Sequence, residues 1–194
     1  KELKMQFPIN NCAGVPINFH PGAFGFQRRV NWHPGVDLYV RDGEPVYAIE
    51  KGVVVGNGVF TGPKVGTPFW ETTHYLMVEG KTGVFNYGEM YETLFEVGEE
   101  IEEEQNIGYV KRVLFEHKLR PDIPGHSCSM LHLELYTHGT TEPVHWHQFQ
   151  KPPNLLDPTP YLLQMYFDYP SCPSEIANDL NKFQWDNSKI EKVG

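Results

Sequence analysis

Short runs of β-branched, aromatic and aliphatic residues, separated by glycine and proline, recur along most of this chain. The 18 glycines and 16 prolines are scattered as turn residues, and RDGE (41–44) and EGKTG (79–83) are predicted tight turns, the second closing a hairpin. Many short strands with turn signals between them are typical of an all-β sandwich or barrel. We therefore expect an all-β fold, an antiparallel β-sandwich or open barrel, with strands within residues 36–40, 45–60, 74–80, 83–90, 106–115 and 130–138.

The length of the chain favours a single domain. A chain of 194 residues buries one sizeable core but would be crowded as two domains. We expect an irregular N-terminal arm at 1–22, a main domain at 23–163 and an extension at 164–194 with a short C-terminal helix near 174–183. No apolar run approaches the roughly 18 residues of a membrane span, and the first residues lack the apolar stretch of a signal peptide.

The charge balance argues against nucleic acid as a partner. The net charge is −9, and the 16 lysines and arginines form no cluster of the kind that neutralises phosphates. The acidic run EVGEEIEEEQ (96–105) is predicted to be a solvated edge. The three cysteines, Cys12, Cys128 and Cys172, include no C-x-x-C pair and leave one disulfide possible, with no indication of which two would pair.

Two short segments carry residues that suit a metal. HPGVD places His33 and Asp37 four residues apart, and in MLHLELY strict alternation puts His132 on the polar face of a strand whose leucines share the other face. Catalytic zinc sites use three protein ligands and keep a fourth position for water. His33, Asp37 and His132 are therefore candidate ligands, although each segment alone is a weak signal.

Several further motifs, in a fixed order, connect these segments. AFGFQRRVNWHPGVDLYVRDGEPVYAIEKGVVVG (23–56) resembles the opening of the lysostaphin/LytM-type zinc metallopeptidases, which read Phe-Gly-x-Arg, His-x-Gly-x-Asp-Leu, Gly-x-Pro-Val-x-Ala and Gly-x-Val. VGEEIEEEQNIGYV (97–110), LHLELY (131–136) and LLDPTPYL (155–162) resemble the later motifs of that family. Ordered motifs over most of residues 23–163 are a specific signal.

The resemblance implies a fold, a cofactor and a substrate class. It implies the duplicated-hybrid-motif fold, a Zn²⁺ ion held by His33, Asp37 and His132, and hydrolysis of peptide bonds in bacterial cell-wall peptidoglycan. In such enzymes the metal polarises the scissile carbonyl and lowers the pKa of a bound water. The same resemblance places the protein outside the cytoplasm, in an extracytoplasmic or secreted location.

The chain departs from the family at both catalytic histidines. Met130 stands where the first histidine of the family's His-x-His is found, and Glu89, in NYGEM, stands where its Tyr-x-His has the second. A carboxylate near a zinc-bound water is a competent general base, so Glu89 is a candidate catalytic residue. Alternatively, Glu89 is a fourth metal ligand, which would close the site and leave no place for water.

Other residues have weaker contexts. His145 and His147, in VHWHQF, are an alternative metal pair; Trp32, Tyr87 and His126 are candidate substrate-binding residues near the motifs. Glu134 shares the face of His132 and either orients it from behind or is simply exposed.

The predicted function is zinc-dependent hydrolysis of peptidoglycan peptides with Glu89 as general base. The alternative is a catalytically inactive zinc-binding pseudoenzyme that binds a peptide, a glycan or a protein partner. A β-domain without metal is a third possibility.

Overall fold

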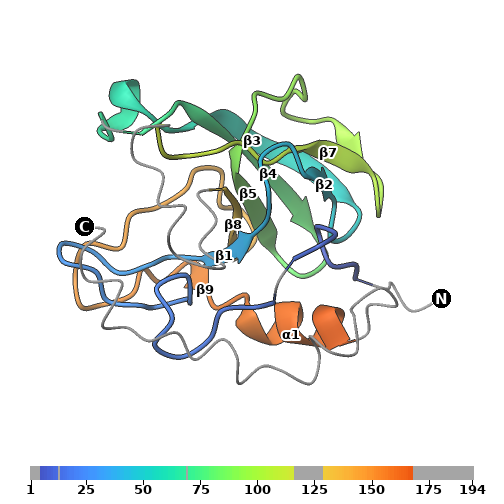
Figure 1. The fold of residues 1–194 in the computed structure, drawn as a ribbon. Helices are drawn as coiled ribbons and strands as arrows, with labels where there is room; N and C mark the ends of the chain where they lie inside the picture. Colours follow the sequence, from blue (N-terminus) through green and yellow to red (C-terminus); the bar gives the residue numbers. More distant parts are fainter. Residues whose placement is uncertain (1–4, 13, 69, 116–128, 168–194) are drawn as a thin grey trace.

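The fold is a twisted, mostly antiparallel β-structure with one short α-helix beneath it (Figure 1). A computed structural model describes residues 5–12, 14–68, 70–115 and 129–167. A seven-stranded open sheet has the order β1-β8-β5-β4-β3-β6, with β9 paired to β8, and a two-stranded sheet joins β2 and β7. The elements are β1 (Val36–Tyr39), β2 (Pro45–Tyr47), β3 (Gly52–Thr61), the 3-10 helix η1 (Pro63–Val65), β4 (Thr73–Gly80), β5 (Val84–Met90), β6 (Glu100–Ile101), β7 (Asn106–Tyr109), β8 (Met130–Tyr136), β9 (Leu155–Leu156) and α1 (Thr159–Phe167).

The predicted all-β antiparallel fold is confirmed, as are both tight turns. Gly43 has φ 83° in the first turn, and the Gly80 N–H donates to the Gly83 carbonyl (2.9 Å) in the hairpin between β4 and β5. The run at 45–60 contains two strands, β2 and β3. Strand β2 pairs with β7, and just after it the Ala48 N–H donates to the Gln105 carbonyl (2.9 Å) before β7. Strand β3 pairs instead with β4 and β6, so the chain changes sheets between β2 and β3.

The described residues contain one α-helix, which the sequence analysis did not predict. The predicted helix at 174–183 falls outside the described residues, whereas α1 occupies Thr159–Phe167 within the DPTPYL segment. The Asp157 carboxylate accepts a hydrogen bond from the Thr159 N–H (2.8 Å) at the start of α1. Figure 1 shows α1 against one side of the β-structure, where Leu162, Met165 and Tyr166 join the core.

The N-terminal segment has no regular strand among residues 5–12 and 14–22, yet it belongs to the core. Phe7 packs edge-on against Tyr166 of α1, with ring centroids 5.3 Å apart, and Ile9 forms a bridge with Val46 of β2. Cys12 is buried, and its thiol donates a hydrogen bond to the Gly14 carbonyl (3.2 Å). Cys128 and Cys172 lie outside the described residues.

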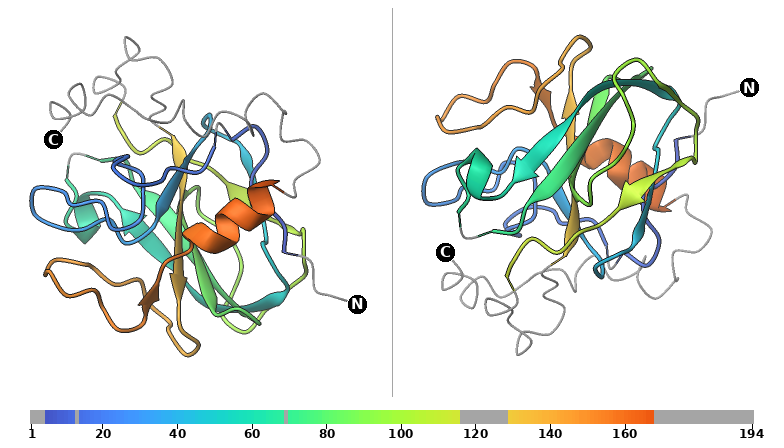
Figure 2. Two further views of the ribbon diagram at one scale, coloured as in Figure 1. Left: turned by 90° about the horizontal axis from the view of Figure 1, so that it is seen from below. Right: turned by 90° about the horizontal axis from the view of Figure 1, so that it is seen from above.

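The strand order makes neighbours of β1, β8 and β5, the strands that carry Asp37, His132 and Glu89. Strand β8 lies between β1 and β5, and the segment carrying η1 and the orange segment after β8 extend from the same end in all three views (Figures 1 and 2). None of the helices in the described part of the chain is long and apolar enough to cross a membrane.

Candidate metal centre

Sheet register positions the candidate ligands. Asp37 of β1 lies directly opposite His132 of β8, and on the other side of β8 the partner of His132 is Gly88, next to Glu89. His33 precedes β1 and is held by two backbone hydrogen bonds, from its own N–H to the Phe26 carbonyl (2.9 Å) and from Gly25 to the His33 carbonyl (2.8 Å). Asp37 and His132, 95 residues apart in sequence, thus meet through strand pairing, and the loop before β1 brings His33 to them.

Close packing against β8 explains why HPGVD has a glycine at residue 35. A Cβ atom at this position would lie 2.5 Å from the Leu133 carbonyl oxygen and 2.9 Å from Nε2 of His132. Real Cβ atoms essentially never approach backbone oxygens that closely, so the loop packs against β8 only because residue 35 lacks a side chain. The glycine therefore lets His33 approach His132.

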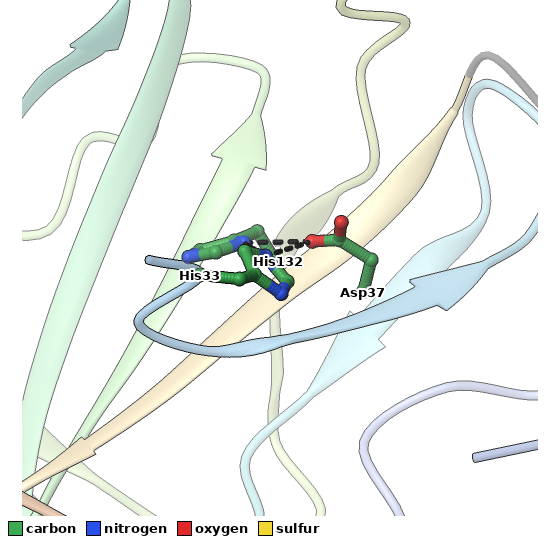
Figure 3. A group of neighbouring side chains, drawn as sticks. All are labelled: His33, Asp37 and His132. Atoms are coloured by element: carbon green, nitrogen blue, oxygen red, sulfur yellow. Dashed lines mark hydrogen bonds and ion pairs between the residues drawn. The ribbon is translucent and has the colours of Figure 1, made fainter. Parts of the chain in front are cut away.

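Three buried side chains converge on one point (Figure 3). Nε2 of His33 lies 3.2 Å from Oδ1 of Asp37 and 3.2 Å from Nδ1 of His132, and the last two atoms are 2.7 Å apart. Ligand atoms at 2.0–2.1 Å from a tetrahedral zinc ion lie about 3.3 Å from one another. The three atoms therefore already have nearly the spacing that one small metal ion requires.

The hydrogen bonds behind the ligands set the imidazole tautomers. Nδ1 of His33 lies 2.9 Å from the Ala23 carbonyl, and Nε2 of His132 lies 2.9 Å from Oε1 of Glu134. Each oxygen accepts a hydrogen bond from the N–H at that nitrogen, so in the neutral imidazole the lone pair of the other nitrogen points toward the shared centre. This arrangement is the one that metal-binding histidines adopt.

Glu134 is buried, with 1% of its surface exposed, and not solvated as one sequence-based interpretation allowed. Its other oxygen, Oε2, accepts hydrogen bonds from Asn86 Nδ2 (2.8 Å) and from the Tyr136 hydroxyl (2.6 Å). The face of β8 that carries His132 is thus buried at His132, Glu134 and Tyr136 and partly buried at Met130, although the two-residue alternation marked it only as polar. Glu134 lies where the sequence suggested an orienting residue.

Arg28 was missed by the sequence analysis. Its Nη2 lies 3.5 Å from Oδ2 of Asp37, the carboxylate oxygen that does not face the two histidines, and its side chain is partly exposed. An arginine at that place balances the Asp37 charge and orients the carboxylate. Nothing in the spacing of the RRV tripeptide (28–30) indicated this contact.

The electrostatics favour a positive charge at the centre. Burial works to raise the pKa of Asp37, but His33 and the hydrogen bond from His132 outweigh it and hold that pKa well below its usual range. Burial lowers the pKa of His33, whereas hydrogen bonds to Asp37 and Glu134 overcome burial at His132 and raise its pKa to about 10. Without a metal, a proton on His132 therefore balances the two carboxylates, and a cation bound between the ligands would take its place.

Glu89 lies beside this centre in an unusual state. It is buried, its backbone has φ 63°, and among the described residues nothing hydrogen-bonds its Oε2 atom. Burial, followed by the nearby charge of Asp37, raises its pKa to about 8. Glu89 does not join the group of ligand atoms that lie within 4.8 Å of one another, so the arrangement of side chains does not favour a fourth ligand.

The sequence of the same region identifies the family. Residues 31–143, more than half of the chain, match the sequence pattern of peptidase family M23. This protein belongs to peptidase family M23. The match spans all three candidate ligands together with Glu89 and Met130.

Two proteins of solved structure, lysostaphin and CbpA, share the fold of this M23 domain. Lysostaphin from Staphylococcus simulans, an antimicrobial peptidase, has a TM-score of 0.51 at 18% identity, over 84% of this chain and 55% of that one. CbpA from L. salivarius REN has a TM-score of 0.52 at 18% identity, over 85% and 98%. A zinc-containing peptidase from Vibrio cholerae has a TM-score of 0.46 at 19% identity, over 78% and 41%. The chain thus spans only about half the length of lysostaphin and less of the Vibrio protein, and no curated protein matches its sequence.

The candidate metal centre of the M23 domain opens into a pocket of about 330 Å³. The three ligands, Glu89 and Glu134 line it together with the partly buried Met130. Much of the remaining wall is apolar, formed by Phe60, Val65, Trp70, Val113 and Leu114. The pocket therefore combines a polar floor that can hold a metal with an apolar wall.

Neither of the two predicted substrate-binding residues that the structure describes lines this pocket. Tyr87 is 1% exposed and sits in the core, where its hydroxyl accepts a hydrogen bond from the Ile49 N–H (2.9 Å), so it presents no surface to a ligand in this arrangement. Trp32 stacks on Trp146, with centroids 5.6 Å apart, and is not among the residues that line the pocket. His126 lies outside the described residues.

The alternative metal pair is separate from the centre. His145 and His147 are exposed and stack with ring centroids 5.1 Å apart, but in the described part of the chain no third potential ligand joins them. His145 nevertheless lines the same pocket as Glu89, and both histidines line a second cavity of about 450 Å³.

Proposed function

We propose that this M23 domain is a zinc-dependent endopeptidase that hydrolyses peptide bonds of bacterial peptidoglycan, and therefore acts outside the cytoplasm. The observation that carries the proposal is the convergence of His33 Nε2, Asp37 Oδ1 and His132 Nδ1, each with its outer atom already hydrogen-bonded or ion-paired. Two imidazoles and a carboxylate are a ligand set that suits zinc.

Zinc bound by these three residues would supply a Lewis acid for the scissile carbonyl and lower the pKa of a water molecule in the pocket. Glu89 would then act as the general base. Its carboxylate reaches the pocket without a competing hydrogen bond to Oε2 among the described residues, so it is available to accept a proton from the attacking water. The cation would also lower the pKa of Glu89, because an opposite charge nearby favours the carboxylate.

The reaction balances without a further cofactor. The water oxygen forms a bond to the carbonyl carbon, and the proton that leaves the water passes to Glu89. When the carbon–nitrogen bond breaks, Glu89 returns that proton to the amine that departs, so the base is regenerated. Arg28 and Glu134 hold Asp37 and His132 in place during these steps.

Met130 sets the expected rate. A thioether donates no hydrogen bond, so this position cannot stabilise the negative oxygen of the tetrahedral intermediate as a histidine would. The loss of one such donor costs on the order of 3 kcal/mol, or about a hundredfold in rate. We therefore expect a slow peptidase.

The second candidate function is that of a zinc-bearing pseudoenzyme that binds a peptide, a glycan or a protein partner. Met130 at the pocket wall favours it, because it removes a proton-handling group from a site that otherwise keeps its metal ligands. Such a protein would bind zinc and a ligand but would turn nothing over.

The test is the variant Glu89→Gln, compared with Glu104→Gln as a matched control. Glu104 is exposed, and its backbone φ of 64° nearly equals that of Glu89. Zinc content is measured by atomic absorption, and release of soluble fragments from purified peptidoglycan sacculi by amine labelling and mass spectrometry. We expect Glu89→Gln to retain zinc and lose turnover, while Glu104→Gln matches the wild type. A wild type that binds zinc and sacculi without releasing fragments would favour the pseudoenzyme, and one that binds no zinc would refute both functions.

A further inference from the structure

His145 is a histidine of the pocket that the proposed chemistry does not use. It lines the pocket together with Glu89 and Met130, and it comes from the segment that follows β8. Among the described residues that line this pocket, the other two histidines are the ligands His33 and His132. His145 is therefore the imidazole of the pocket that remains available to a bound molecule.

The backbone on both sides of His145 is anchored. On one side, the Val144 N–H donates to the Tyr136 hydroxyl (3.0 Å), and this hydroxyl donates to Oε2 of Glu134 (2.6 Å). Because Glu134 also bonds the ligand His132, the pocket wall at residue 144 is tied to the metal centre. The exposed position of His145 is thus set by a buried network.

The second anchor is Trp146. Its side chain is buried and stacks on Trp32 at an interplanar angle of 22°, and its carbonyl accepts a hydrogen bond from the Trp32 N–H (2.8 Å). His145 therefore projects from a short segment that is fixed at both neighbours, although it is itself exposed. Because the backbone on both sides of His145 is already fixed, ligand binding would cost little further backbone entropy, as is typical of preorganised binding residues.

We propose that His145 is a substrate-contacting residue whose imidazole N–H donates a hydrogen bond to a backbone carbonyl oxygen of the peptide in the metal pocket. His145 is one of several side chains with hydrogen-bond donors on the pocket wall, which also include Asn31 and Trp70. Met130, by contrast, donates no hydrogen bond, and Arg28 already contacts Asp37 and the Pro21 carbonyl. The inference rests on the proposed function, in which His145 would supply a hydrogen-bond donor that Met130 lacks.

The test uses the full chain loaded with zinc and purified peptidoglycan sacculi as the probe. His145→Ala and His145→Gln are compared with His147→Ala, which removes the stacked neighbour that does not line the metal pocket. Two quantities are measured for each variant: release of soluble fragments, separated into kcat and KM, and binding to sacculi by co-sedimentation. Zinc content and thermal unfolding serve as controls for folding.

We expect His145→Ala to lower kcat/KM, or sacculus affinity if turnover is absent, by at least about tenfold with zinc content and melting temperature unchanged. His145→Gln should recover part of the loss because its amide retains an N–H donor, and His147→Ala should stay within about threefold of wild type. A His145→Ala protein that equals the wild type, or a His147→Ala protein that is equally impaired, would overturn the inference while leaving the proposed function intact. A wild type that neither cleaves nor binds sacculi would overturn both.

Discussion

Replacing Glu89 by glutamine should stabilise the metal-free protein at alkaline pH. The physical reason is that Glu89 is buried and Oε2 has no hydrogen-bond partner among the described residues, so the folded state strongly prefers its neutral form. A glutamine of nearly the same shape is neutral at every pH. The wild type must instead either keep a proton on Glu89 or bury an uncompensated negative charge.

The sign and size of the effect follow from the pKa of Glu89, which is raised from 4.5 to about 8. A group whose pKa is raised in the folded state contributes stability that is fully present below pH 4.5 and is lost as the pH rises through about 8. At about 1.4 kcal/mol per pKa unit, the loss is on the order of 5 kcal/mol. This is comparable with the whole unfolding free energy of a marginally stable domain, which is roughly 5–15 kcal/mol.

The assay is urea unfolding with a chelator at a series of pH values from 5 to 9. We expect the wild type to lose stability across this range relative to Glu89→Gln, while the control Glu104→Gln follows the wild type. Groups that both proteins share titrate in both, so the difference isolates Glu89. Parallel stability curves for wild type and Glu89→Gln would refute the argument that Glu89 is buried and uncompensated.

Added zinc provides the converse measurement. A cation held by the three ligands lowers the pKa of Glu89, so the alkaline penalty should shrink when the same unfolding series is repeated with saturating Zn²⁺. An undiminished gap between wild type and Glu89→Gln with zinc bound would mean that the metal does not sit near Glu89.

Two further substitutions test how the metal centre is built. Gly35→Ala should cost roughly 1–3 kcal/mol and weaken zinc binding, because the added Cβ would press on the Leu133 carbonyl and on the His132 ring; unfolding and zinc titrations check this. Gly43→Ala is the control, since its φ of 83° makes alanine costly by about 1 kcal/mol while zinc affinity should not change. Glu134→Gln should weaken zinc binding by roughly 10–100-fold in a competition titration with a chelator, because the acceptor behind His132 loses its charge. Equal zinc affinity in Glu134→Gln and wild type would contradict the orienting role.

The sequence was most informative where local patterns decide the structure. Alternation and turn residues predicted β1, β4, β5 and β8 to within a few residues, since period-two patterns and glycine turns are local properties. The motif order predicted His33, Asp37 and His132 as a group, and the structure brings them together.

Tertiary contacts account for what the sequence missed. Tyr87 adjoins a motif position, yet its place in β5 turns it into the core, and no local pattern reports on the Ile49 N–H that it satisfies. Arg28 reaches Asp37 from a loop whose path depends on backbone contacts with His33. Such contacts arise from the pairing of segments distant in sequence, which hydrophobic periodicity does not encode.

Glu89 itself bears on the choice between enzyme and pseudoenzyme. Glu89 lowers the stability of the fold in two ways: its backbone has a positive φ although it is not a glycine, and its buried carboxyl has no hydrogen-bond partner at Oε2 among the described residues. A glycine at this position would relieve both costs. Residues that destabilise a fold in this way are concentrated at functional sites, where the surrounding structure holds them against the strain. A protein that used the pocket only for binding would have no need of an uncompensated carboxyl beside its metal ligands. Met130 argues in the opposite direction, because it lacks the hydrogen-bond donor of a histidine. A missing donor slows a hydrolase, however, whereas a missing general base would abolish the reaction, and Glu89 supplies the proposed base. The physical balance therefore favours a slow hydrolase over an inactive scaffold.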